Sequence, residues 1–89
     1  MVNKGWQLRM KRKVERLFKG SCNRPVQGIE KALIPLGFKE TGADPLAVAF
    51  EHPVMELYLE IELGDARCVH NYLLVTFDEK NKKRRKFRW

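Results

Sequence analysis

The clearest pattern of apolar and polar positions lies in residues 55–63. Apolar side chains hold every odd position of this segment, while the even positions carry Glu56, Tyr58, Glu60 and Glu62. A period of two is typical of a β-strand with one buried and one polar face, whereas a helix would scatter the leucines around its circumference. We therefore predict a strand here, with its acidic side toward solvent.

A pattern with steps of three and four residues lies near the N-terminus. Asn3 can cap a helix that begins near Lys4 or Gly5, and Gly20 and Ser21 end it. Its predicted apolar stripe comprises Trp6, Met10, Val14, Leu17 and Phe18. Its predicted basic side comprises Arg9, Arg12, Lys13, Arg16 and Lys19. This first helix is therefore long, amphipathic and basic.

A second, shorter helix is predicted after Pro25, a residue that suits a first helical turn. Gly28 costs this helix roughly 1 kcal/mol relative to alanine. Pro35 and Gly37 end it. Its inner face comprises Val26, Ile29, Leu33 and Leu36.

The rest of the chain has short apolar runs separated by turn-forming residues, which is typical of strands. The expected strands are residues 38–41, 46–52, 55–63 and 69–77, and residues 84–89 are compatible with a last one. In the fourth, Val69, Leu73, Val75 and Phe77 are expected to share one face, and Tyr72 and Leu74 the other. Apolar residues on both faces predict a central place in the sheet or partial cover on the second face.

These elements predict an α+β fold. Two N-terminal helices, the first long and basic and the second short, pack on a three- to four-stranded, mainly antiparallel sheet. Residues 1–89 are expected to form one small domain, with a basic C-terminal strand or tail at about residues 80–89.

The net charge of +7 is divided unevenly along the chain. Residues 1–24 contain eight Lys or Arg and one Glu, residues 25–79 contain three basic and ten acidic residues, and residues 80–89 contain seven basic residues and no acid. Both ends are strongly basic and the middle is acidic. Segregated charge indicates surfaces that meet a charged partner or each other.

Length and composition favour a small binding protein over an enzyme. A chain of 89 residues buries only about 60–65% of its unfolded surface, which leaves little apolar material to enclose a deep substrate cavity. The N-terminus lacks a signal-peptide pattern, and no segment reaches the ~20 apolar residues of a membrane span. We expect a cytoplasmic protein with no membrane association.

Residues of metal-ligand type occur without the spacing of a metal site. The set comprises Cys22, His52, Cys68 and His70, and it contains no Cys-x-x-Cys pair. We predict free thiols, no metal site, no cofactor and no catalytic residue.

The basic side of the first helix is the first candidate surface. Its guanidinium and ammonium groups are spaced to follow a phosphate backbone, where neutralised phosphates release counterions. The alternative is that Lys and Arg only provide the solvated face of an amphipathic helix. Glu15 alone balances them in this helix, which is more positive charge than solubility requires.

The C-terminal run is the second candidate surface. Its Lys and Arg side chains can bind phosphates, and Phe87 and Trp89 can stack on unpaired bases. The residues assigned to it as binding groups are Lys83, Arg84, Arg85, Lys86, Arg88 and Trp89. Two alternatives stay open. As a strand, the run would pair Arg84, Lys86 and Arg88 with Glu56, Glu60 and Glu62 for about 0.2–1 kcal/mol per pair; otherwise it is a loose tail.

The acidic side of the 55–63 strand is the third candidate surface. Glu56, Tyr58, Glu60 and Glu62 can bind a basic protein or imitate the phosphates of a nucleic acid. The alternative is the ordinary solvent side of an antiparallel sheet.

Two short segments resemble portions of a known family. Residues 36–40 (Leu-Gly-Phe-Lys-Glu) and 50–53 (Phe-Glu-His-Pro) are similar to the Leu-Gly-Phe and Phe-x-His-Pro portions of HicA-type RNA-cleaving toxins. The resemblance implies a small fold like that of double-stranded-RNA-binding domains, and it favours RNA. The family's Gly-Ser-His segment would fall near residues 44–47, where this chain has no histidine, so no catalytic residue is carried over.

The leading expectation is a small non-enzymatic nucleic-acid-binding protein, with RNA preferred to DNA, that uses the basic helix and the basic-aromatic C-terminus. The alternative is a protein-binding inhibitor or regulator of the phage or plasmid type. It would dock through the same helix or through the glutamate-rich sheet face. The sequence leaves the oligomeric state open.

Overall fold

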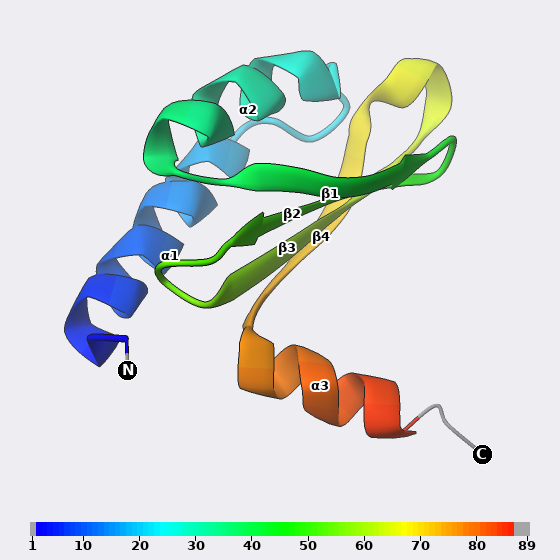
Figure 1. Cartoon of the computed structure of the whole chain (residues 1–89). Helices are drawn as coiled ribbons and strands as arrows, with labels where there is room; N and C mark the ends of the chain where they lie inside the picture. The colour runs from blue at the N-terminus through cyan, green and yellow to red at the C-terminus, as the bar shows by residue number, and fades with distance from the viewer. Residues whose placement is uncertain (1, 87–89) are drawn as a thin grey trace.

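A computed structural model describes residues 2–86 of the chain and the side chains of residues 2–81. Figure 1 shows two N-terminal helices, a four-stranded sheet and a C-terminal helix. The helices are α1 (Lys4–Phe18), α2 (Val26–Leu33) and α3 (Phe77–Lys86). The strands are β1 (Lys39–Asp44), β2 (Ala47–His52), β3 (Leu57–Leu63) and β4 (Val69–Thr76). Short 3-10 turns at Ile34–Leu36 and Asp65–Arg67 follow α2 and precede β4.

The sheet is antiparallel throughout, and its strand order β1-β2-β3-β4 is the order in the chain. Each strand is joined to the next by a short connection, as antiparallel neighbours allow. Helices α1 and α2 lie on the same face of the sheet (Figure 1). The predicted α+β fold with two N-terminal helices on an antiparallel sheet is confirmed.

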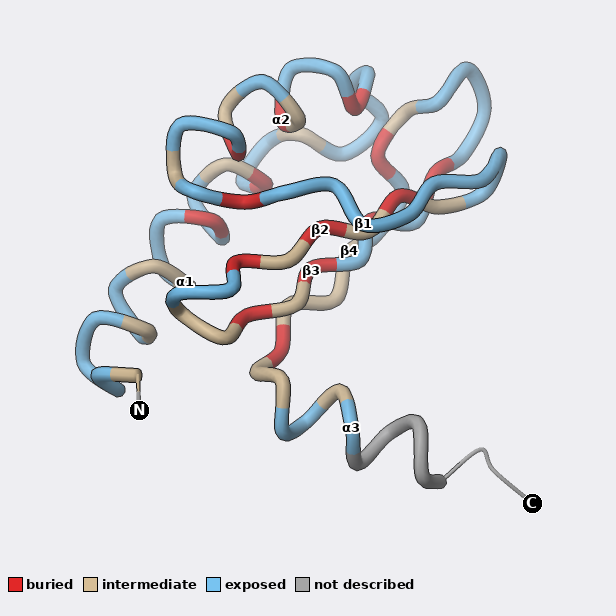
Figure 2. Tube along the Cα trace, viewed as in Figure 1, coloured by how far each residue is buried: buried red, intermediate tan, exposed pale blue. Residues whose placement is uncertain are grey.

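Strand β3 carries the centre of the core. Leu57, Leu59, Ile61 and Leu63 are all buried, whereas Glu60 and Glu62 between them are exposed. Figure 2 shows this alternation along β2 and β3. The predicted strand therefore forms as expected, but it begins at Leu57. Glu56 lies in the β2–β3 turn with a φ of +53°, so its assignment to the acidic strand face is wrong.

Helix α1 starts where the sequence indicated, because the Trp6 amide N–H donates to Oδ1 of Asn3 at 3.1 Å. Val14 and Phe18 are buried, and Met10 and Leu17 pack at the edge of the core. The assignment of Trp6 to the apolar stripe is wrong, since Trp6 is 59% exposed. Gln7 lies toward the body instead, and its Nε2 donates to the Met55 carbonyl oxygen at 2.8 Å.

A bulge changes which residues of β4 face the core. Leu63 is paired with Val69, but Glu62 is paired with Asn71, so β4 contains one extra residue at this point. Tyr72 and Leu74 consequently lie opposite Ile61 and Leu59 on the core side. The prediction that Val69 and Leu73 share one face is therefore wrong.

Strand β4 lies at the edge of the sheet, so the prediction of a central place is wrong and that of partial cover holds. Val75 lies opposite Tyr58 on the outer face and is only 6% exposed. Helix α3 packs against β3 and β4. Phe77, expected in the strand, is the first residue of α3.

Residues 77–86 are helical, so the predicted C-terminal strand does not form in the described residues. The reason lies at the helix start. The Glu79 amide donates to Oγ1 of Thr76 and the Thr76 amide to Oε1 of Glu79, both at 3.2 Å. This reciprocal pair is a capping box, which favours a helix over an extended segment. Cross-strand pairing of Arg84 and Lys86 with β3 is excluded by the helix, and residues 87–89 lie outside the described residues.

Candidate nucleic-acid interface

The predicted basic side of α1 forms a single exposed surface, which we call the α1 basic face. Its members are Arg9, Arg12, Lys13, Arg16 and Lys19, and all are exposed. At 100° per residue they span an arc of roughly 120° on the side of the helix away from Val14. The salt bridges found in the described part of the chain join other groups, His70 with Glu62 and Lys80 with Glu51. The α1 basic face is therefore available to an external anion.

The packing of α1 fixes the direction in which this face points. Val14 is fully buried and Phe18 is 8% exposed, with the Phe18 ring stacked on Tyr72 at a centroid distance of 4.0 Å. The helix cannot rotate about its axis without removing these side chains from the core. Lys19 is the residue just after the last helical turn, and its amide donates to the Arg16 carbonyl oxygen at 3.3 Å.

Trp6 is an aromatic neighbour of the α1 basic face that the sequence pattern placed in the core. It precedes Arg9 by three residues, so the two side chains lie within one turn on the same side. Trp6 lies roughly 80° around the helix from Val14, at the border of the buried stripe. This angle follows from the sequence positions alone, and it distinguishes the exposed Trp6 from Met10, which lies closer to the centre of the buried stripe.

The C-terminal basic run, the second candidate surface, begins near α1 at the β2–β3 turn but extends away from that helix. The Phe77 amide donates to the Glu56 carbonyl oxygen at 2.9 Å, and Gln7 is bonded to the neighbouring Met55. Helices α1 and α3 are thus both attached to the β2–β3 turn. They leave it in different directions (Figure 1). The backbone of residues 83–86 continues along α3, while Arg88 and Trp89 lie outside the described residues.

One cation of the C-terminal run pairs within the protein. Nζ of Lys80 lies 2.7 Å from Oε2 of Glu51 and 4.3 Å from the centre of the Tyr58 ring. This pair joins the C-terminal run to the outer face of the sheet, but it involves none of the residues in the predicted pairing of Arg84, Lys86 and Arg88 with Glu56, Glu60 and Glu62. It does not come from a paired strand.

The acidic face of β3 is smaller than predicted. Tyr58 donates through its hydroxyl to Oε1 of Glu60 at 2.8 Å, and Glu62 lies 3.5 Å from Nε2 of His70. Glu60 and Glu62 are exposed, whereas Glu56 is absent from this face because it lies in the turn. Two glutamates and a tyrosine remain as a candidate docking surface.

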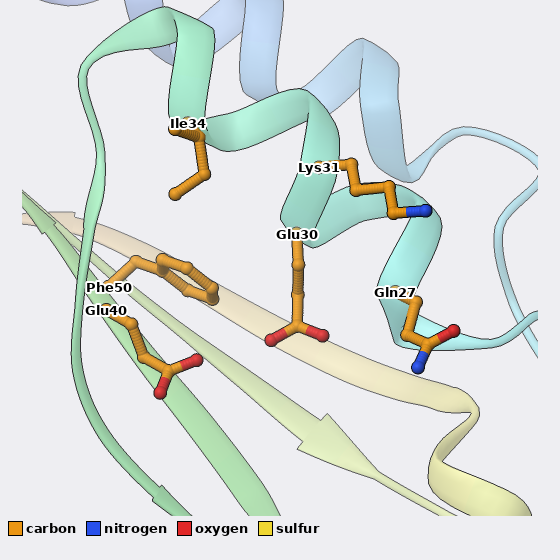
Figure 3. Close-up of a pocket in the computed structure, with 6 residues that line it drawn as sticks. All are labelled: Gln27, Glu30, Lys31, Ile34, Glu40 and Phe50. Atoms are coloured by element: carbon orange, nitrogen blue, oxygen red, sulfur yellow. The ribbon is translucent and has the colours of Figure 1, made fainter.

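A groove between α2 and the sheet has a cavity volume of about 360 Å³. It is lined by Gln27, Glu30, Lys31, Ile34, Glu40 and Phe50. Figure 3 shows Glu30 of α2 and Glu40 of β1 pointing toward one another, while the amino group of Lys31 points away. Burial raises the pKa of Glu30, the Glu40 charge and hydrogen bond raise it further, and Arg67 opposes them. The protonated form of Glu30 is therefore more favoured than that of an exposed glutamate.

His52 and the two cysteines do not assemble a metal site. Nδ1 of the buried His52 accepts the Met55 amide hydrogen at 3.0 Å, and Nε2 lies 2.8 Å from the Leu36 carbonyl oxygen, to which it donates. Both ring nitrogens are therefore occupied. Cys22 and Cys68 are free thiols. In the described part of the chain, no group of three or more His, Cys, Asp or Glu side chains is arranged to hold a metal ion.

No helix within residues 2–86 combines the length and the apolar content needed to cross a bilayer. No protein-family model matches the chain, and neither a curated protein nor a solved structure matches it. The short likeness to HicA-type toxins therefore does not extend to a family match.

Proposed function

We propose that this protein is a small, non-enzymatic, cytoplasmic nucleic-acid-binding protein, with RNA preferred to DNA. The observation that carries the proposal is the α1 basic face, in which all five predicted cations are exposed on a helix anchored by its opposite side. Cations held close together in this way repel one another. A polyanion relieves that repulsion and gains free energy from the release of its counterions.

The proposed interaction is mainly electrostatic. In this proposal Arg9, Arg12, Lys13, Arg16 and Lys19 contact phosphates along α1. Further positive charge comes from Lys83, Arg84, Arg85, Lys86 and Arg88, with Trp89 as an additional stacking group. Contacts to phosphates position a nucleic acid without reading its sequence. We therefore propose binding with little sequence specificity.

Fluorescence anisotropy with a labelled RNA tests this proposal. If about six phosphates are neutralised, log affinity falls with log salt concentration at a slope near −5 on a duplex and about −4 on a single strand. The double variant Arg12→Glu/Arg16→Glu should abolish binding, while Glu60→Lys/Glu62→Lys on the opposite side of the sheet should not weaken it. A complex that is insensitive to salt, or no complex at low salt, would contradict the proposal.

The alternative function is a protein-binding inhibitor or regulator. It is favoured by the open outer face of the sheet, where Glu60 and Glu62 lie opposite the small residues Ala49 and Ala47. A basic protein can approach such a surface closely. If Glu60→Lys/Glu62→Lys abolishes the biological effect and Arg12→Glu/Arg16→Glu does not, this alternative replaces the leading proposal.

A further inference from the structure

Trp6 is a large apolar side chain that the fold leaves in water. It is 59% exposed, although it belongs to a helix that buries Val14 and Phe18 completely or nearly so. Tryptophan has one of the largest apolar surfaces of any side chain, and its ring stabilises a fold or a complex when it is covered. Since the core does not cover Trp6, a ligand is the remaining source of that stabilisation.

The backbone beneath Trp6 is held at two points. Its own amide donates to Asn3 Oδ1 at 3.1 Å, and the side chain of the next residue, Gln7, is bonded to the Met55 carbonyl oxygen at 2.8 Å. The first turn of α1 is therefore tied both to its cap and to the β2–β3 turn. The point on the surface from which the indole ring projects is therefore fixed, which lowers the entropic cost of binding against it.

The surroundings of Trp6 identify the kind of ligand. Arg9 follows Trp6 by three residues and Lys13 follows Arg9 by four, so the ring lies at the N-terminal end of the α1 basic face. A row of cations that ends in an exposed aromatic ring matches the two parts of a single strand, its phosphates and its unstacked bases. In a duplex, by contrast, the flat faces of the bases are covered by their neighbours and do not reach a ring on a protein surface.

A lipid surface fits these observations less well. A helix that lies in a membrane interface must turn a continuous apolar face toward the lipid. The apolar face of α1 is occupied by the sheet through Val14 and Phe18. Only Trp6 and Leu8, which is 48% exposed, would remain as large apolar contacts from this helix.

We propose that Trp6 is a stacking platform for an unpaired base, and that the α1 basic face consequently prefers single-stranded nucleic acid to a duplex. This inference rests on the proposed function and specifies its substrate class. Stacking of one base on an aromatic ring changes affinity by about 5- to 100-fold when the ring is removed.

The test compares a fluorescein-labelled oligouridylate of about 12 nucleotides with an RNA duplex of the same length. The variants are Trp6→Ala, Trp6→Phe and, as a matched control, Leu46→Ala, which removes an exposed apolar side chain of the β1–β2 turn without changing charge. We expect Trp6→Ala to weaken oligouridylate binding by about 5- to 100-fold, with an unchanged salt slope and unchanged duplex binding. Trp6→Phe should lose less affinity, and Leu46→Ala should lose none.

A second readout reports the ring directly. Oligouridylate should quench the tryptophan fluorescence of a Trp89→Phe variant, in which Trp6 is the only tryptophan. Circular dichroism establishes that each variant retains its helices. Equal binding by wild type and Trp6→Ala, or equal losses on single strand and duplex, overturns the stacking platform.

The two proposals fail in different ways. If Arg12→Glu/Arg16→Glu abolishes binding but Trp6→Ala does not alter it, the nucleic-acid proposal stands and the stacking inference is wrong. If the wild-type protein binds neither RNA at low salt, the proposed function is wrong and the inference falls with it.

Discussion

The imidazole ring of His52 occupies the space that a side chain at Gly37 would need. A Cβ atom placed on Gly37 would lie 2.6 Å from Nε2 of His52, well inside van der Waals contact. Gly37 also has a φ of +101°, a region that residues with a Cβ rarely adopt. The same ring nitrogen donates to the carbonyl oxygen of Leu36. The end of the 3-10 turn that follows α2 is therefore held against the end of β2.

We predict that Gly37→Ala strongly destabilises the protein. The positive φ alone costs about 1–2 kcal/mol for a residue with a Cβ, and displacement of the His52 ring adds to it. A loss of 2 kcal/mol or more corresponds to a fall in Tm of at least about 8 °C for a domain of this size. Thermal denaturation followed by circular dichroism measures it. Gly28→Ala is the control, because a Cβ there meets no atom within 4 Å, and it should stabilise α2.

The two segments that resemble portions of HicA-type toxins meet at the contact between Gly37 and His52. Leu36, Gly37 and Phe38 from one segment meet His52 from the other, and the Phe38 ring stands edge-on to the imidazole at a centroid distance of 5.1 Å. The segments pack against each other at the junction of helix and sheet. The residues of the two segments therefore have a packing role in this fold.

The capping box at the start of α3 leads to a second prediction. Thr76→Ala removes the acceptor of the Glu79 amide, which typically costs a helix about 1 kcal/mol. Because the described polar contacts of α3 with the body, those of Phe77 with Glu56 and of Lys80 with Glu51, lie in its first turns, we expect local rather than global unfolding. Hydrogen exchange of the amides in residues 77–81 should become about fivefold faster for each 1 kcal/mol lost. Thr41→Ala in the exposed strand β1 is the matched control. Unchanged exchange in Thr76→Ala would show that the box does not hold the helix.

The sequence predicted those features that depend on one element and its immediate periodicity. The alternation in β3 and the helical steps from Met10 to Phe18 each describe a face that one layer of the fold covers. The pattern wrongly places Val69 and Leu73 on one face of β4, because a bulge depends on the pairing of two strands and cannot be read from one strand alone. It wrongly places Trp6 in the core, because steps of four residues include the border of an apolar stripe as well as its centre.

The C-terminal helix was missed for another reason. A run of Lys and Arg has neither helical nor strand periodicity, so the strand prediction depends on the alternation at its end, where Phe87 and Trp89 share a face. Thr76-x-x-Glu79 was a readable capping-box signal immediately before that run. The contact of His52 with Gly37 had no such signal, because it joins residues from separate elements and depends on how α2 is placed over β2.

The groove between α2 and β1 gives a prediction about pH. Because the pKa of Glu30 is raised above its ordinary value of 4.5, the protonated form is favoured in the folded state. Its contribution to stability is therefore present below pH 4.5 and is lost as the pH rises through the raised value. Glu30→Gln, which cannot ionise, should be more stable than wild type at pH 7 and equally stable at pH 3.

Urea denaturation at a series of pH values between 3 and 7 measures this difference. Glu40→Gln is the companion variant, because it removes the neighbouring charge and should give a smaller gain in the same direction. A greater loss of stability in Glu30→Gln at pH 7 than at pH 3 would reverse the sign and contradict the arrangement of the two carboxyl groups.

The last prediction concerns the contribution of single side chains of the α1 basic face to binding. If each side chain contacts one phosphate, Arg12→Gln and Arg16→Gln should each reduce the magnitude of the salt slope on single-stranded RNA by about 0.7. Arg24→Gln is the matched control, since Arg24 is equally exposed but lies between α1 and α2, outside the face. Binding that depends only on total charge would be weakened equally by all three variants. If binding depends on the geometry of α1, Arg24→Gln should bind as the wild-type protein does. We expect this result because Val14 and Phe18 fix the direction in which the α1 basic face points.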